Sequence, residues 1–96
     1  MLQSVVVDLH IEKIAKGYSR FTPSDAIIYQ ISHFDLSLAK YRGRRGQKID
    51  FIHGSGAGVL RAELIKRLQT RYPGYKYEDA PFNLYGFQGA IRVTIL

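Results

Sequence analysis

Two histidines and one aspartate are the residues of this chain best suited to acid–base chemistry. Asp8 and His10 stand two positions apart at the end of one apolar run, and His53 ends another. An imidazole titrates near neutral pH, so it can act as general base, general acid or phosphate donor. Asp8 could orient such a ring or hold a metal ion. A polar pair that only closes a strand is the structural alternative.

The same three side chains could bind a divalent metal ion. Their spacing matches no strong metal motif, so we name no metal ligands and assign no cofactor. The chain contains no cysteine, which excludes a zinc–thiolate site and a disulfide framework.

A glycine-rich segment, Gly54–Gly58, follows His53 directly. Glycines permit positive φ and close backbone approach, and the N–H groups of a following helix attract anions. Val59 stands where the dinucleotide fingerprint needs glycine, and no Lys-Ser or Lys-Thr pair makes a P-loop. His53 also replaces the first glycine of a hydrolase elbow around Ser55. A phosphate site and a plain strand-to-helix turn both remain open.

Apolar periodicity predicts four strands that would position these residues. Val5, Val6 and Val7 place valine on both faces of the first strand, which predicts burial on both sides. The strands are expected at Gln3–His10, Lys48–His53, Tyr75–Asp79 and Ala90–Leu96.

Two main helices are expected between the strands. Thr22 and Asp25 suit a capping box, with Pro23 at the first helical position and an end before Gly43. The second helix is expected over Val59–Tyr72 and is stopped by the Pro73-Gly74 pair. The predicted buried stripes are Ile27, Ile31, Phe34, Leu38 and Tyr41 on the first helix, and Leu60, Leu64, Ile65, Leu68 and Tyr72 on the second.

The expected order is β-α-β-α-β-β, with loops at Ile11–Phe21 and Ala80–Gly89. Right-handed crossovers make the early strands parallel, and the last two strands are expected to be antiparallel. The prediction is an α/β fold, a two-layer sandwich of a four-stranded mixed sheet and two main helices. We expect residues 1–96 to form one monomeric domain of a longer protein, with its oligomeric state left open. Asp8, His10 and His53 then converge at the carboxyl edge of the sheet.

The charge is basic, with 14 Lys and Arg against 8 Asp and Glu, a formal net charge of +6. Basic modules often meet phosphate backbones, although a charge of this size also serves solubility. No apolar run is long enough to span a membrane and no signal-peptide pattern is present, so we expect a cytoplasmic protein. One basic stretch contains Lys40, Arg42, Arg44, Arg45 and Lys48 without an acid among them.

Aromatic residues near the C-terminus have two interpretations. Phe82, Tyr85 and Phe87 flank glycines and could stack on nucleic-acid bases, or they could pack in the core or a hairpin. Tyr75 and Tyr77 are expected to pack against the fold. His33 lies off the apolar stripe of its helix, and we expect it at the surface.

Two motifs resemble those of the Smr (small MutS-related) family, and the similarity covers nearly the whole chain. The first is Val7–His10, similar to the family's Leu-Asp-Leu-His-Gly motif, and the second is His53–Arg61, similar to His-Gly-x-Gly-x-Gly-x-Leu-Arg. Tyr85–Ala90 is similar to the family's glycine-containing end. Ile11 replaces a usual glycine and the connection to Phe21 is longer. Both departures resemble a variant at the C-terminus of longer uncharacterised bacterial proteins.

The resemblance implies a fold like the C-terminal domain of translation initiation factor three, together with nucleic-acid binding. Some members of the family nick DNA or cleave RNA, and others are linked to recombination control or ribosome rescue. By position, Asp8 and His10 match the motif tied to cleavage. His53, Gly54, Gly56 and Gly58 match the loop thought to contact the backbone.

We therefore expect nucleic acid, DNA or RNA, as the partner, and no membrane. Binding to nucleic acid ranks first, and cleavage ranks second: the domain would then also be an endonuclease whose catalytic residues are Asp8, His10 and His53. The alternative is a non-catalytic module that tethers a larger protein to nucleic acid, a ribosome or an acidic protein partner. The expected nucleic-acid contacts are Gly54, Ser55, Gly56, Gly58, Arg61, Arg42, Arg44, Arg45 and Lys48.

Overall fold

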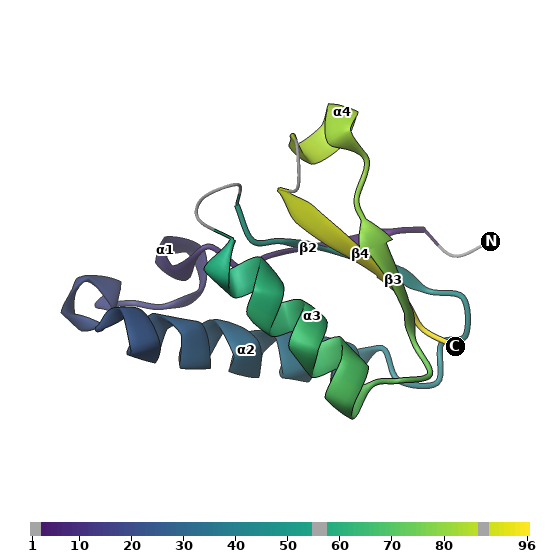
Figure 1. Ribbon diagram of the computed structural model, residues 1–96, viewed down its shortest axis with the longest axis horizontal. Coiled ribbons are helices and arrows are strands. Elements are labelled where there is room, and N and C mark those ends of the chain that lie inside the picture. Colours follow the sequence, from purple (N-terminus) through teal and green to yellow (C-terminus); the bar gives the residue numbers. More distant parts are fainter. Residues whose placement is uncertain (1–2, 55–57, 87–88) are drawn as a thin grey trace.

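The computed structural model describes residues 3–54, 58–86 and 89–96, and within them a four-stranded sheet is covered on one face by two long helices (Figure 1). The strands are β1 (Val5–Asp8), β2 (Lys48–Ile52), β3 (Lys76–Asp79) and β4 (Ala90–Thr94). The long helices are α2 (Pro23–Lys40) and α3 (Val59–Arg71). The predicted two-layer α/β sandwich is confirmed.

The strands lie side by side in the order β1-β2-β4-β3. β1 and β2 are parallel, so Asp8 is level with Ile52 at the carboxyl end of both strands. β4 is antiparallel to both of its neighbours, β2 and β3. The predicted mixed sheet is therefore present, and β1 and β3 are its two edges.

Helix α2 begins where the capping residues predict. The backbone N–H of Asp25 donates to Oγ1 of Thr22 at 3.1 Å, and the Thr22 N–H donates to Oδ2 of Asp25 at 3.1 Å. Pro23 occupies the first turn, where its missing N–H costs no hydrogen bond. These contacts fix the start of the helix that returns from the carboxyl edge of β1.

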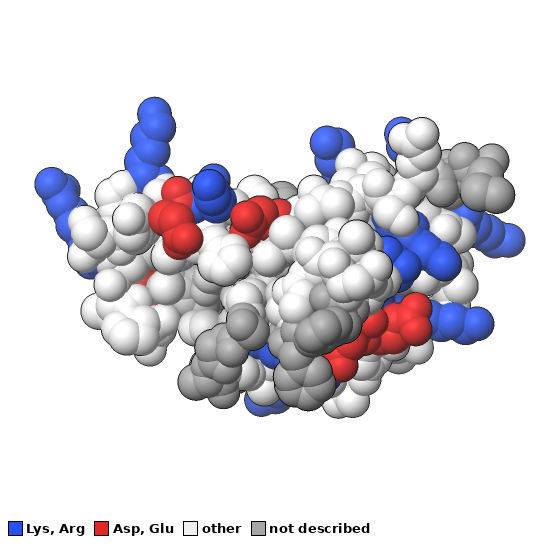
Figure 2. Space-filling model, turned by 90° about the horizontal axis from the view of Figure 1, so that it is seen from above, with Lys and Arg blue, Asp and Glu red and all other residues white. Residues whose placement is uncertain are grey.

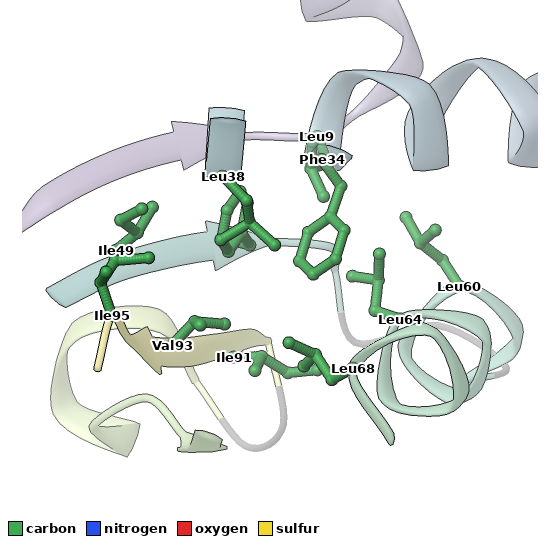
Figure 3. Packing of buried hydrophobic residues seen from close by; sticks show 11 residues of the cluster. Leu9, Phe34, Leu38, Ile49, Leu60, Leu64, Leu68, Ile91, Val93 and Ile95 are labelled. Carbon is green, nitrogen blue, oxygen red and sulfur yellow. The ribbon is translucent and has the colours of Figure 1, made fainter. Parts of the chain in front are cut away.

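The core lies between the helices and the inner face of the sheet (Figure 3). Phe34 and Leu38 from α2 meet Leu60, Leu64 and Leu68 from α3, as the predicted stripes require. Ile27, Tyr41, Ile65 and Tyr72 pack against this cluster and are partly buried. The strands contribute alternate residues: Leu9 just after β1, Ile49 and Phe51 from β2, Ile91 and Val93 from β4, and Ile95 just after β4.

The expectation that β1 is buried on both faces is wrong. Val6 is 54% exposed, because both long helices cover the same face of the sheet and β1 is an edge strand. Valine on both faces therefore reflects β-propensity rather than two-sided burial.

Both connections expected to be loops contain short helices. Residues 11–21 include α1 (Ile11–Ile14) and a single 3-10 turn (Tyr18–Arg20), and residues 80–89 include α4 (Phe82–Tyr85). Tyr75 packs partly buried against the core, as expected, whereas Tyr77 is 37% exposed. His33 is partly buried rather than fully at the surface.

The face of the sheet opposite the long helices carries a buried carboxylate. Asp50 of β2 is only 1% exposed. Arg92 of β4 donates to it from Nε at 2.7 Å and from Nη2 at 3.0 Å, and the Tyr85 hydroxyl donates at 2.8 Å. Tyr85 therefore ties α4 to the sheet through a hydrogen bond, and its stacking on nucleic-acid bases stays a prediction. In the described part of the chain, no helix is both long and apolar enough to cross a membrane.

Candidate functional site

Asp8 and His10 form a hydrogen-bonded dyad at the carboxyl end of β1. Oδ1 of Asp8 lies 2.7 Å from Nδ1 of His10 and also accepts the His10 backbone N–H at 2.9 Å. A carboxylate only accepts, so Nδ1 carries the proton and Nε2 of the neutral ring carries the lone pair. The side chains are 36% and 40% exposed, so a ligand can reach them.

Gln30 of α2 holds the residue between the two members of the dyad. Its side-chain Nε2 donates to the backbone carbonyl of Leu9 at 2.8 Å, and Gln30 is only 9% exposed. The Leu9 N–H donates to the Ile52 carbonyl at 2.8 Å, and the Leu9 side chain is fully buried. The backbone that carries Asp8 and His10 is therefore fixed to both β2 and α2.

His53 follows β2 and lies partly buried. Its Nδ1 is 2.8 Å from the carbonyl oxygen of Gly54. Because a carbonyl only accepts, Nδ1 is the protonated nitrogen and Nε2 carries the lone pair. Nε2 is buried and has no hydrogen-bond partner among the described residues. A buried acceptor without a partner is uncommon in native proteins.

Gly54 connects His53 to His10 in space. Its φ is +85°, and a Cβ placed on it would stand 3.0 Å from Nε2 of His10. The N–H groups of His53 and Gly54 both donate to the carbonyl of Gly89 at 3.0 Å. Gly89, just before β4, therefore holds the backbone turn at His53 and Gly54 in place. The absence of a side chain at Gly54 therefore leaves space beside Nε2 of His10, at the edge of the sheet.

Local electrostatics differ between the carboxylate and the buried imidazole. Burial raises the pKa of Asp8, but hydrogen bonds from the His10 N–H and ring outweigh burial, so the pKa lies below its usual value. Burial lowers the pKa of His53, the hydrogen bond to Gly54 opposes that effect, and the charges of Arg61 and His10 lower the pKa further. At neutral pH, Asp8 is therefore ionised and His53 is neutral.

Arg61, an expected nucleic-acid contact, is engaged by a carboxylate. Its Nε and Nη2 donate to Oδ1 of Asp79 at 3.1 and 3.0 Å, and Nη2 also donates to Oδ2 at 3.2 Å. The pair lies near the site, since both charges act on the pKa of His53. An anion that binds Arg61 would have to compete with Asp79.

The basic turn lies at the other end of the sheet from the histidines. Arg42, Arg44 and Arg45 precede the first residue of β2, Lys48, whereas His53 follows its last residue. Five strand steps of ~3.3 Å put Lys48 and His53 roughly 16 Å apart. The guanidinium of Arg44 lies 5.5 Å from the centre of the Tyr41 ring. The basic turn and the dyad are therefore not one cluster.

Basic and acidic side chains both lie on the face seen in Figure 2. Lys and Arg side chains stand in separate groups, some at its margin and some within it, and Asp and Glu side chains lie beside some of them. The charge pattern on this face is therefore mixed rather than a single basic stripe.

Part of the expected binding loop lies outside the described residues. Ser55 and Gly56 of that loop are not described. Phe87, from the later loop expected over residues 80–89, also lies outside the described residues. Gly58 is described: it caps α3 with φ +81° and ψ 8°, a left-handed conformation that favours glycine. Among the described residues, the expected site members brought together are Asp8, His10, His53 and Gly54.

Three residues that help to build this edge were not predicted from the sequence. Gln30 stands among apolar residues of α2, and Asp79 and Gly89 are separated from their partners by long stretches of chain. A polar residue inside an otherwise apolar helical stripe is the one sequence signal that could have identified Gln30.

No group of three His, Cys, Asp or Glu side chains in the described part of the chain is arranged to hold a metal ion. Oδ1 of Asp8 accepts two hydrogen bonds from His10, and the proposal below includes no step through a metal ion. Comparisons with family models, curated proteins and solved structures found no match to this chain.

Proposed function

We propose that this protein binds nucleic acid at the edge formed by Asp8, His10 and Gly54, and cleaves a phosphodiester bond there. The observation that carries the proposal is the Asp8–His10 dyad, in which the carboxylate holds Nδ1 at 2.7 Å and leaves Nε2 beside Gly54. The resemblance of Val7–His10 and His53–Arg61 to Smr motifs supports it. The net charge of +6 supports a polyanionic substrate.

In this proposal His10 is the general base and Asp8 orients it. Nε2 of His10 removes a proton from water or from a hydroxyl of the substrate, and that oxygen attacks phosphorus. Asp8 stabilises the imidazolium that forms, as a carboxylate does beside a catalytic histidine. The bond from phosphorus to the leaving oxygen then breaks, and that oxygen takes a proton from the imidazolium or from solvent.

Backbone N–H groups for the phosphate would come from the start of α3. The N–H of Gly54 is already bonded to Gly89, so it is not available. The first intrahelical bond of α3 runs from the Ala62 N–H to Gly58, which leaves the N–H groups of Val59 to Arg61 without intrahelical acceptors. These groups suit a phosphate oxygen. His53, with Nε2 buried, has a positioning role: its Nδ1–H braces the turn at Gly54.

Binding without cleavage is the second candidate function. It is favoured by the position of the basic turn, which lies at the opposite end of the sheet from His10. A strand held by Arg42, Arg44 and Arg45 would not need to reach the dyad. A tether of this kind would bind through counterion release and would weaken steeply with salt.

One set of variants separates these functions. Purified wild-type protein and the His10→Gln and Asp8→Asn variants would be incubated with end-labelled hairpin RNA and supercoiled plasmid, with magnesium or with chelator. His33→Gln is the matched control, because it removes the third histidine of the chain from α2. We expect wild type and His33→Gln to cut, and His10→Gln to bind, with at most a small loss of affinity, without cutting.

Each other outcome has a definite meaning. Equal cutting by His10→Gln would reject the role of the dyad. Binding without cutting by any variant, lost on charge reversal of Arg42, Arg44 and Arg45, would establish the tether. Binding that does not respond to salt between 50 and 300 mM, roughly the range over which phosphate contacts weaken strongly, would reject both functions.

A further inference from the structure

Among the described residues, no strand pairs with the outer edge of β1. β1 pairs with β2 on one side and is the first strand of the sheet. The Leu9 N–H donates to β2, and backbone groups alternate in direction along a strand. The N–H and C=O groups of Val5 and Val7 therefore face β2, whereas those of Val6 face the open edge.

The two edges of the sheet differ in how they are protected. Exposed edge strands are usually guarded against pairing by charged residues or proline. β3, at the far edge, reads Lys-Tyr-Glu-Asp and carries charge at three of four positions. β1 reads Val-Val-Val-Asp, and its one carboxylate is engaged by His10. β1 is therefore the edge that is open to an added strand.

A groove of about 650 Å³ runs along this open edge, between β1 and α2. Val6 and Leu36 are 54% and 69% exposed and supply its apolar surface. The groove is also lined by Ile14, Ser37 and Tyr41. An extended segment beside β1 could bury Leu36 beneath it while it pairs with the backbone of Val6.

Two lysines stand at opposite ends of the groove. α2 runs back against the direction of β1, so Lys40 lies toward the Val5 end, and Lys13 follows β1 at the Asp8 end (Figure 1). Neither lysine belongs to an ion pair among the described residues. Asp8 lines the same end of the groove as Lys13 and is ionised, so among the charged lining residues two positive charges stand against one negative charge. The groove therefore keeps a net positive charge, which favours acidic side chains.

We propose that this groove binds an acidic, extended peptide, which adds a fifth strand to the sheet beside β1. The backbone of Val6 supplies hydrogen bonds, as in other cases of strand addition. Apolar side chains of the peptide cover Leu36, and carboxylates at either end pair with Lys13 and Lys40. Successive side chains of a strand point to opposite faces, so carboxylates four positions apart share a face and stand roughly 13 Å apart, slightly more than the roughly 10 Å that the four residues of β1 span. The proposal goes beyond the proposed cleavage, although the groove reaches Asp8, a member of the dyad.

The probe is a fluorescein-labelled synthetic nonapeptide of valine and threonine with glutamate at its third and seventh positions, which share one face of an extended strand with a valine at the fifth position. Its binding to the whole chain would be followed by fluorescence anisotropy and by ¹⁵N-resolved NMR. We expect shifts centred on Val5–Asp8, slower exchange of the Val6 amide proton, and no binding of the same peptide with lysine in place of glutamate. Shifts centred elsewhere, or no binding at millimolar peptide, would overturn the proposal.

Two variants test the two sources of affinity. The K13E/K40E double variant should weaken binding about tenfold or more through charge reversal, whereas the matched K66E/K76E variant, on α3 and β3, should not. Val6→Pro should abolish binding and leave the fold intact, because it removes an N–H that faces away from β2. Should Val6→Pro fail to fold, the lysine variants alone decide. Equal affinity of both double variants would overturn the proposal, as would self-association through β1 in sedimentation without peptide.

Discussion

The side-chain amide of Gln30 donates a 2.8 Å hydrogen bond to the backbone carbonyl of Leu9. Leu9 lies between the two members of the dyad, and its N–H donates to Ile52 on β2. Helix α2 and strand β2 therefore both bond to the backbone of Leu9. The geometry of the dyad depends on a residue of α2 that touches neither of its side chains.

Replacement of Gln30 by leucine should lower both stability and cleavage. The carbonyl of Leu9 would lose a buried donor, which costs about 1–3 kcal/mol of the free energy of unfolding. Urea titration would measure that loss, and single-turnover cleavage would measure the second effect. Gln69→Leu is the matched control, because the Gln69 amide bonds the Tyr77 hydroxyl in an exposed setting. Equal losses in the two variants would contradict a special role for Gln30.

Alanine at Gly54 should harm function more than alanine at Gly58. Both glycines have φ above +80°, so either alanine costs about 1 kcal/mol of backbone strain. Among the described residues, the new Cβ at Gly54 would stand 3.0 Å from Nε2 of His10, whereas none lies within 4 Å of a Cβ at Gly58. We expect similar losses of stability but a much larger loss of cleavage in Gly54→Ala. Similar cleavage rates would show that this contact is unimportant.

Local sequence patterns predicted the fold and part of the edge. The Thr22–Asp25 capping box is a short-range motif, and strand parity alone put Asp8 and His10 on one side. Parallel topology then brought His53 to the same edge. Each of these inferences needs only neighbouring residues or the order of the elements.

The unpredicted features depend on contacts between distant residues. Asp50 alternates with apolar residues of β2, a pattern that predicts a side chain facing solvent. Tyr85 and Arg92 nevertheless cover it, from 35 and 42 residues away in the sequence. The exposure of Val6 depends on which strand lies outermost and on both helices covering one face. Periodicity along a single strand carries neither piece of information.

Loss of the Arg92 side chain should be far more destabilising than loss of the Arg61 side chain. Asp50 is 1% exposed, so Arg92→Met leaves a buried carboxylate without its main partner, at a cost of about 3 kcal/mol. Arg61 and Asp79 are 27% and 41% exposed, so Arg61→Met should cost at most about 1 kcal/mol. Urea unfolding at pH 7 would compare them. Equal costs would mean that Tyr85 alone satisfies Asp50.

The lowered pKa of His53 predicts a pH-dependent loss of stability on the acid side. Burial favours the neutral ring in the folded state, whereas the unfolded chain takes up a proton near the ordinary value of 6.5. Between the folded pKa and 6.5 the unfolded chain binds more protons, so stability rises with pH in that window. The contribution is complete above pH 6.5 and is lost as the pH falls through the folded pKa.

His53→Gln should therefore flatten the pH dependence of the free energy of unfolding below pH 6.5, measured by urea titration at half-unit steps from pH 5 to 8. Glutamine does not titrate, so the slope in this window should fall even where the variant is less stable throughout. His33→Gln removes a histidine that does not share the turn at Gly54, and it should keep the slope that His53 produces. A slope that survives in His53→Gln and disappears in His33→Gln would show that His33, and not His53, produces the pH dependence of stability.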